Sequence, residues 1–295
     1  MNARRAAVAL ALIVAALWSS RSARATEAPS ETARRGWSPR LEPFRPWEYV
    51  ATAGVQATSL YVRWNLPPPT HARWTGDNPF DDAVRAWLRA DTAEGRARAD
   101  HLSDWVSYAG TAAPFAIDLP VVLFAHRDGN VTWQMLMMDL EATAAANFAN
   151  NVLFYAAGRG RPSSKDCAAD PSYDRLCGGA SNNASLPSGH TVTIATAAGL
   201  TCVHHRHLRI YENELADGAA CVAVSLATIA TGVLRIMADR HFTTDVLLGA
   251  AIGFGSGYGL PTLLHYRGLG DGGPEVALLP FAGPSVIGLG VGGAL

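Results

Sequence analysis

From Trp47 onward, apolar stretches alternate with short polar joints along most of the chain. The uncharged run over residues 246–264 is as long as a complete helix. Proline and glycine mark the joints, most clearly the three consecutive prolines at 67–69. The pattern predicts an all-α helical bundle, with helices over residues 47–63, 80–92, 98–126, 131–157, 189–207, 217–237 and 243–265.

Residues 159–187 break this pattern because they are rich in Gly, Pro, Ser, Asn and Asp. They predict a long loop, and long loops inside compact domains are often functional. The C-terminal tail is Gly-rich, and its two short apolar runs around Val276 and Val286 suggest a small hairpin. We therefore expect a helical domain over 47–267, with its motif-bearing core at 100–265, and a tail over 268–295.

The N-terminus has the pattern of a secretory signal. Two arginines precede an uncharged apolar run over residues 6–18, and residues 23–25 read Ala-Arg-Ala, a small-x-small cleavage site. The apolar run is short for a bilayer span. We expect a signal peptide over 1–25, with an uncleaved anchor as the alternative, followed by a disordered leader over 26–46.

Composition narrows the function classes. The chain has 295 residues, of which 49% are hydrophobic and 17% charged, so it can bury a sizeable core. Its net charge of -1 and its lack of a basic stripe argue against a general nucleic-acid binder. Any positive charge that matters for function is therefore local.

Four cysteines are consistent with export to an oxidising compartment. The simplest connectivity joins neighbours, Cys167 with Cys177 and Cys202 with Cys221, and the alternative is free structural thiols. Their spacings match no zinc site.

The sequence features disagree on whether the chain crosses a membrane. Residues 246–264 are long and uncharged enough to span, and residues 219–234 are borderline. Asp139 and Glu141 lie inside another helix, where a charge at bilayer depth is costly. Mean hydropathy is only +0.08. We expect an exported, periplasmic domain that is soluble or membrane-associated, with an integral membrane protein as the alternative.

Three polar clusters border the long loop and the joint between the last two helices. The first is Gly-Arg-Gly-Arg-Pro over 158–162, and the second is Pro-Ser-Gly-His over 187–190. The third consists of Arg235, His241 and Asp245. Each alone has an ordinary explanation as a helix cap, a solvated arginine or a surface pair. Together, between apolar helices, they indicate one shared site.

Part of this set suits a small tetrahedral anion. Ser188 and Gly189 open a helix whose first amides lack intrahelical partners, which favours an anion there. Arg161 and Arg235 can each offer a planar fork of donors to phosphate oxygens. These residues predict a phosphate-binding pocket.

The remaining part suits nucleophilic catalysis. His241 and Asp245 are four residues apart, so on a helix they share a face. The carboxylate can accept from one ring nitrogen and leave the lone pair of the other aimed outward, which is a nucleophile with its orienting group. His190 then supplies an acid that can protonate a leaving oxygen.

In this order, the clusters resemble the three-part signature of the type 2 phosphatidic acid phosphatase and vanadium-dependent haloperoxidase superfamily. The resemblance covers about residues 100–265 and implies a helical bundle that gathers the three parts at one end. It implies that His241 attacks phosphorus, Asp245 orients it and His190 protonates the leaving group. It also implies hydrolysis without a metal or cofactor, with phosphoryl oxygens held by Arg161, Arg235, Ser188 and the Gly189 amide.

Two positions depart from the family pattern. The lysine usual seven residues before the first arginine is Phe154 here, and the serine usual before the second arginine is Leu234. Losing one preorganised donor can cost a few kcal/mol of transition-state stabilisation. Arg159 and Lys165 are candidates to replace the lysine, although neither stands at the matching position.

We therefore expect a metal-independent phosphatase acting on a phosphomonoester or diphosphate. Export to the periplasm favours a lipid phosphate or a polyprenyl diphosphate as the substrate over a soluble ester. One alternative is a vanadate-dependent haloperoxidase, because the same cradle can hold vanadate, although the chain lacks an extra helical half. Another is a catalytically weakened phosphate-binding envelope protein, which Phe154 suggests.

Other polar residues have ordinary interpretations. Histidines 204, 205 and 207 lie beside arginines, which favours a solvated basic helix end over a metal site. Asp139 and Glu141 either line the pocket or face water, and residues 239–240 are expected to form the turn that carries His241.

Overall fold

A computed structural model describes residues 41–74, 78–179, 182–267, 275–283 and 286–294. The signal peptide expected over 1–25 and most of the expected leader lie outside these residues. The end of that leader is described, and it packs on the helices: Leu41 and Phe44 are buried. The Phe44 amide donates to the Gln134 side chain at 2.7 Å. This part of the segment is therefore attached to the helical domain and does not form a disordered leader.

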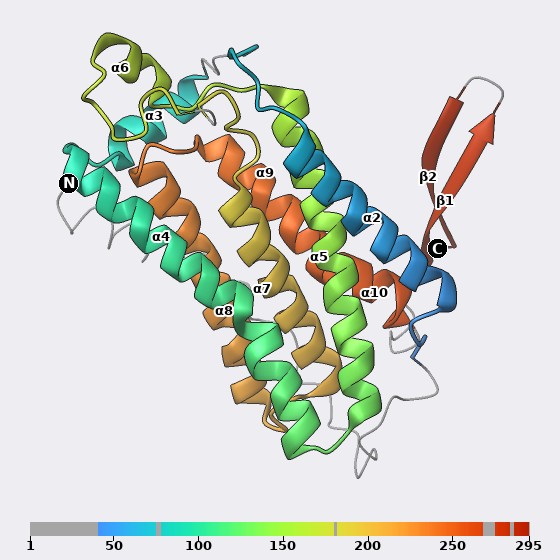
Figure 1. Ribbon diagram of the computed structural model, residues 1–295. Coiled ribbons are helices and arrows are strands. Elements are labelled where there is room, and N and C mark those ends of the chain that lie inside the picture. The colour runs from blue at the N-terminus through green and yellow to red at the C-terminus, as the bar shows by residue number, and fades with distance from the viewer. Residues whose placement is uncertain (1–40, 75–77, 180–181, 268–274, 284–285, 295) are drawn as a thin grey trace.

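The described residues confirm the predicted all-α class and form a helical bundle (Figure 1). Every predicted helix is present, with ends shifted by a few residues, and only the short helix in the long loop was not predicted. The long helices are α2 (Pro46–Asn65), α3 (Pro79–Leu88), α4 (Ala93–Ala113), α5 (Gly129–Ala157), α7 (Gly189–Leu208), α8 (Glu214–Met237) and α9 (Thr243–Phe254). The shorter segments are η1 (Pro114–Asp118), η2 (Val121–Ala125), α6 (Ser164–Ala169), η3 (Gly255–Gly259) and α10 (Leu260–Leu264).

Local sequence explains where the helices begin and end. Asn78, Asp128 and Asn213 cap the starts of α3, α5 and α8, with side-chain oxygens that accept from first-turn amides. Helix α5 ends at Gly158, whose φ of 58° is in the left-handed region that favours glycine. Pro114 removes an amide donor after α4, and the helix continues as the wider π-helical turn η1.

Helix α7 lies at the centre of the bundle, and a row of glycines brings α9 and η3 into close contact with it (Figure 1). Gly249, Gly253 and Gly257 follow each other at four-residue intervals. A Cβ at Gly253 would lie 2.2 Å from the Val192 carbonyl oxygen, and one at Gly257 would lie 2.1 Å from that of Thr196. Only glycine permits this approach, which is typical of closely packed apolar helices. The contact places the start of α9 beside the start of α7.

The other end of the bundle holds buried polar pairs. His204 is fully buried, with its ring nitrogens 2.8 Å from the Tyr266 hydroxyl and 2.9 Å from Asp139. His205 is also buried and contacts Asp217 and Asp118, at 2.6 and 3.2 Å. The prediction of a solvated basic helix end is therefore wrong for these two histidines, because carboxylates from other helices surround them.

Three segments among the described residues are long and apolar enough to cross a membrane. They are 93–125, 214–237 and 243–264, and only 17%, 22% and 22% of their apolar windows are buried inside the protein. Large apolar side chains consequently face outward, including Trp105, Phe124 and Leu215. Residues 219–234, borderline from the sequence, belong to one of these segments.

Both expected disulfides are present, Cys167 with Cys177 and Cys202 with Cys221. In the tail, β1 (Glu275–Gly283) and β2 (Val286–Ala294) form an antiparallel hairpin that pairs Glu275 with Ala294. The strands contain the two apolar runs that suggested a hairpin.

Candidate active site

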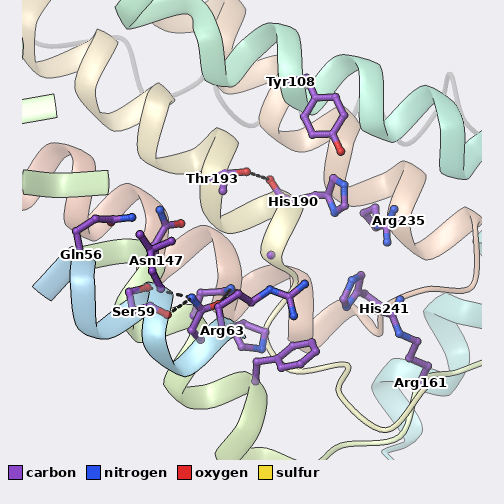
Figure 2. Close-up of a pocket in the computed structure, with 16 residues that line it drawn as sticks. Gln56, Ser59, Arg63, Tyr108, Asn147, Arg161, His190, Thr193, Arg235 and His241 are labelled. Atoms are coloured by element: carbon purple, nitrogen blue, oxygen red, sulfur yellow. Dashed lines mark hydrogen bonds between the residues drawn. The ribbon is translucent and has the colours of Figure 1, made fainter. Parts of the chain in front are cut away.

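The three polar clusters meet at one cavity. Its volume is about 440 Å³, and α2, α4, α5, the start of α7 and the joint between α8 and α9 contribute to its walls (Figure 2). His190, His241, Arg161, Arg235 and Gly189 all line it. The residues predicted to act together are therefore brought together, although they come from three separate stretches of sequence.

His241 is held in one tautomer by the backbone. Its Nδ1 lies 2.7 Å from the carbonyl oxygen of Ser185, which can only accept, so Nδ1 carries the proton and Nε2 the lone pair. Burial, followed by the Arg161 and Arg235 guanidinium groups, holds the pKa of His241 well below its ordinary value of 6.5. At neutral pH this imidazole is uncharged and can act as a nucleophile.

Asp245 stabilises the segment that holds His241 but makes no direct hydrogen bond to the ring. Its Oδ2 lies 3.9 Å from His241 Nδ1, and the Ser185 carbonyl takes the position expected for the carboxylate. Asp245 instead accepts from the Ser185 hydroxyl at 2.6 Å and from the Phe242 amide at 2.8 Å. The expected orienting effect is therefore indirect and passes through Ser185, a residue that sequence reasoning missed.

Arg159 lies outside the cavity. Its guanidinium is buried between the rings of Trp74 and Phe242 and pairs with Asp81 at 2.7 Å and Asp245 at 2.5 Å. Both carboxylates are fully buried, so removing the cation would leave two buried charges unpaired. The suggestion that Arg159 binds phosphate is a misassignment, since packing commits its donors elsewhere. Lys165 does not line the cavity either.

Arg161 and Arg235 supply positive charge to the cavity. Arg235 donates to Asp100 at 2.7 Å, and the same carboxylate accepts from Arg240 at 3.0 Å. Burial, then repulsion from Arg235 and Arg240, lowers the pKa of Arg161 to about 9. Asp100 thus pairs with Arg235, Arg240 and also Arg175, and one carboxylate facing three guanidinium groups leaves an excess of positive charge that favours binding of an anion.

His190, the second residue of α7, lies at the cavity beside a carboxylate. Its Nε2 is 3.0 Å from Asp104 Oδ1. Burial and then Arg235 lower the pKa of His190 to about 4, while the Asp104 carboxylate opposes that shift. A bound phosphoryl dianion would neutralise the nearby cations and raise the pKa again, which favours proton donation when substrate is present.

Besides the His190 side chain, the start of α7 contributes backbone atoms to the cavity. Gly189 lines the cavity, and the nearest group to a Cβ there would be the Asn150 amide, at 3.6 Å. Ser188 holds the N-cap position, but it is buried and its hydroxyl contacts that of Thr191 at 2.9 Å. The predicted helix start is present, and the Ser188 hydroxyl faces its own helix instead of the cavity.

The other polar residues singled out in the sequence do not line the cavity. Asp139 is fully buried against His204 and neither lines the cavity nor faces water. Asp239 adopts a φ of 60° and, as predicted, forms the turn before His241. One group of metal-ligand type occurs among the described residues, and none of its members lines the cavity: Glu48, Glu141 and His265.

Comparison with known proteins agrees with the geometry. Residues 136–269 match the model of the PAP2 superfamily, and this range contains all three clusters. The chain is 28% identical over 176 residues to lipid A 1-phosphatase of Porphyromonas gingivalis. That match covers 59% of this chain and 32% of the relative, so the chain spans about a third of that protein's length. No solved structure matches the chain.

Proposed function

We propose that the chain is a phosphatase of the PAP2 superfamily, whose model matches residues 136–269, and that it hydrolyses a lipid phosphate through a phosphohistidine intermediate. One observation carries the proposal. His241 and His190 line the same cavity as Arg161 and Arg235, so a nucleophile, an acid and two phosphate-binding cations surround one space.

In the first step, Nε2 of His241 attacks phosphorus. The N–P bond forms as the bond to the leaving oxygen breaks, and that oxygen takes its proton from His190. Arg161, Arg235 and the amides at the start of α7 stabilise the charge that develops on the other phosphoryl oxygens. The Ser185 carbonyl keeps the proton on Nδ1 and thereby keeps the reactive lone pair on Nε2.

In the second step, water attacks the phosphohistidine. His190, now neutral, accepts a proton from this water while the N–P bond breaks and returns its electron pair to Nε2. Inorganic phosphate leaves, and both histidines return to their initial protonation states. The same residue thus serves as acid and then as base.

We further propose that the segments 93–125, 214–237 and 243–264 cross a membrane. The 24 residues of α8 span about 36 Å, enough for a hydrocarbon core of about 30 Å. Their outward faces are apolar, and immersion in water would leave that surface exposed.

The site groups lie at corresponding ends of these segments. Arg235 is in the last turn of α8 and Asp245 is in the first turn of α9, while Asp100 and Asp104 lie in the N-terminal half of the segment 93–125. The cavity therefore lies near one membrane face, where a lipid headgroup could enter while its chains stay in the bilayer. A lipid phosphate fits this location better than a soluble ester.

The test is phosphate release by the purified full chain in detergent micelles. The substrates are a phosphatidate, a polyprenyl diphosphate and the soluble ester p-nitrophenyl phosphate. We expect release from a lipid substrate and a loss on the order of 10³-fold or more in His241→Ala. His101→Ala, at an exposed position on α4, is the matched control. Full turnover in His241→Ala would refute the proposal.

A further inference from the structure

The cavity has a cation on its α2 wall that the three clusters do not include. Arg63, in the last turn of α2, lines the cavity from the side opposite His241 and Arg161 (Figure 2). Its guanidinium carbon lies 5.6 Å from the centroid of the Phe154 ring, within cation–π range. Phe154 also lines the cavity. The aromatic residue at the family's lysine position therefore supports an arginine from another helix.

Contacts between α2 and α5 hold the backbone of Arg63 in place. The Tyr155 hydroxyl donates to the Arg63 carbonyl at 3.1 Å. One turn earlier, the Asn151 amide donates to the Ser59 carbonyl at 3.2 Å and to its hydroxyl at 2.9 Å. These bonds fix the end of α2 against α5, so the Arg63 side chain starts from a defined point at the cavity rim.

The charge of Arg63 is not compensated by any carboxylate among the described residues. By contrast, Arg235 and Arg240 share Asp100, and Arg159 pairs with two aspartates. Arg63 is also exposed, so its guanidinium can turn toward a ligand at little cost. An arginine that lies on an aromatic ring, without an acidic partner and at the rim of a cationic cavity, is suited to bind an anion.

We propose that Arg63 binds the phosphoryl group of the substrate and supplies the cation that Phe154 cannot. This inference rests on the proposed function and extends the site to α2, which lies outside the matched family range of 136–269. The planar guanidinium can donate two parallel hydrogen bonds to phosphoryl oxygens, which one lysine ammonium does not. The substitution at 154 therefore relocates a phosphate contact to a different helix.

The experiment compares Arg63→Ala, Arg63→Gln and Arg63→Ala combined with Phe154→Lys in the full chain. Two quantities are measured: kcat/KM for the lipid substrate and the affinity for inorganic vanadate, which mimics the transferring phosphoryl group. We expect both single variants to lose about 10- to 100-fold in kcat/KM and to bind vanadate correspondingly more weakly. The lysine at 154 should recover most of this loss.

Arg98→Ala is the matched control, because Arg98 is an exposed arginine on α4 that pairs with Glu94 and does not line the cavity. Arg63→Gln keeps a polar side chain with the same Cβ–Cγ–Cδ stem and removes the charge, so it is the second variant to use if the alanine variant does not fold. Wild-type kcat/KM and wild-type vanadate affinity in folded Arg63→Gln would overturn the inference. His241→Ala tests the proposed function separately, and vanadate affinity still decides the role of Arg63 where turnover is absent.

Discussion

The row of glycines on α9 and η3 makes a quantitative prediction about how the fold positions the site. In Gly253→Ala, the new Cβ would lie 2.2 Å from the Val192 carbonyl oxygen and 2.8 Å from Ala195 Cβ. Both distances are far below van der Waals contact, so α9 must move away from α7 by about 1 Å. Overpacking of this kind costs about 1–3 kcal/mol.

Gly255→Ala provides a matched control two residues away. A Cβ at Gly255 would meet nothing within 4 Å, and its φ of -60° suits any residue. Both substitutions gain about 1 kcal/mol from the higher helix propensity of alanine. The difference between the two variants therefore isolates the packing cost, and we expect Gly253→Ala to be less stable than Gly255→Ala by about 1–3 kcal/mol.

The same displacement should lower activity, because α9 carries Asp245 and follows directly after His241, while α7 carries His190. A shift of about 1 Å in catalytic geometry can cost about 100-fold in rate. The assay is denaturant unfolding in detergent micelles together with phosphate release. Equal stability and equal turnover in Gly253→Ala and Gly255→Ala would refute the claim that close contact between α7 and α9 aligns the histidines.

Two further predictions concern the charges around the histidines. In Asp104→Asn, loss of the carboxylate 3.0 Å from His190 should lower the pKa of His190. A smaller fraction of the acid form then remains, so the alkaline limb of the kcat/KM profile should move to lower pH, and an unchanged profile would contradict this. Arg159→Met should lower the free energy of unfolding by about 3–5 kcal/mol, because Asp81 and Asp245 lose their buried cation. The folded fraction should keep its vanadate affinity in a binding titration, and a selective loss of affinity without loss of stability would restore Arg159 as a phosphate ligand.

The helices and the convergence of the three clusters could be predicted because the signals for them are local in the sequence. Apolar runs and capping residues lie in the chain itself, and each cluster stands at a helix end or joint. His190 begins α7 and His241 lies just before α9, so a bundle that packs α7 against α9 brings them together. The glycines at 249, 253 and 257 that produce this packing form a four-residue repeat in the sequence. This repeat is the signal that predicts a close helix contact.

Contacts between distant segments explain what sequence reasoning missed. Arg159 and Arg161 are two residues apart, and it is the rings of Trp74 and Phe242 and the carboxylates of Asp81 and Asp245 that commit Arg159 to the interior. Arg63 comes from a helix some 90 residues before Phe154, and no local motif marks it. Likewise, the acidic partners of His204 and His205 come from other helices. The local sequence, in which arginines flank these histidines, therefore predicted solvent exposure.

Direct detection of the phosphoenzyme tests the central claim most sharply. Full-length protein turning over p-nitrophenyl phosphate is quenched in alkali, which preserves phosphohistidine, and the phosphorylated residue is identified by peptide mass spectrometry. His190→Ala should accumulate the intermediate, because water then lacks its general base. A phosphoryl group on His241 is the predicted result. A phosphoryl group on any other residue, or turnover without a covalent intermediate in both wild type and His190→Ala, would contradict the mechanism.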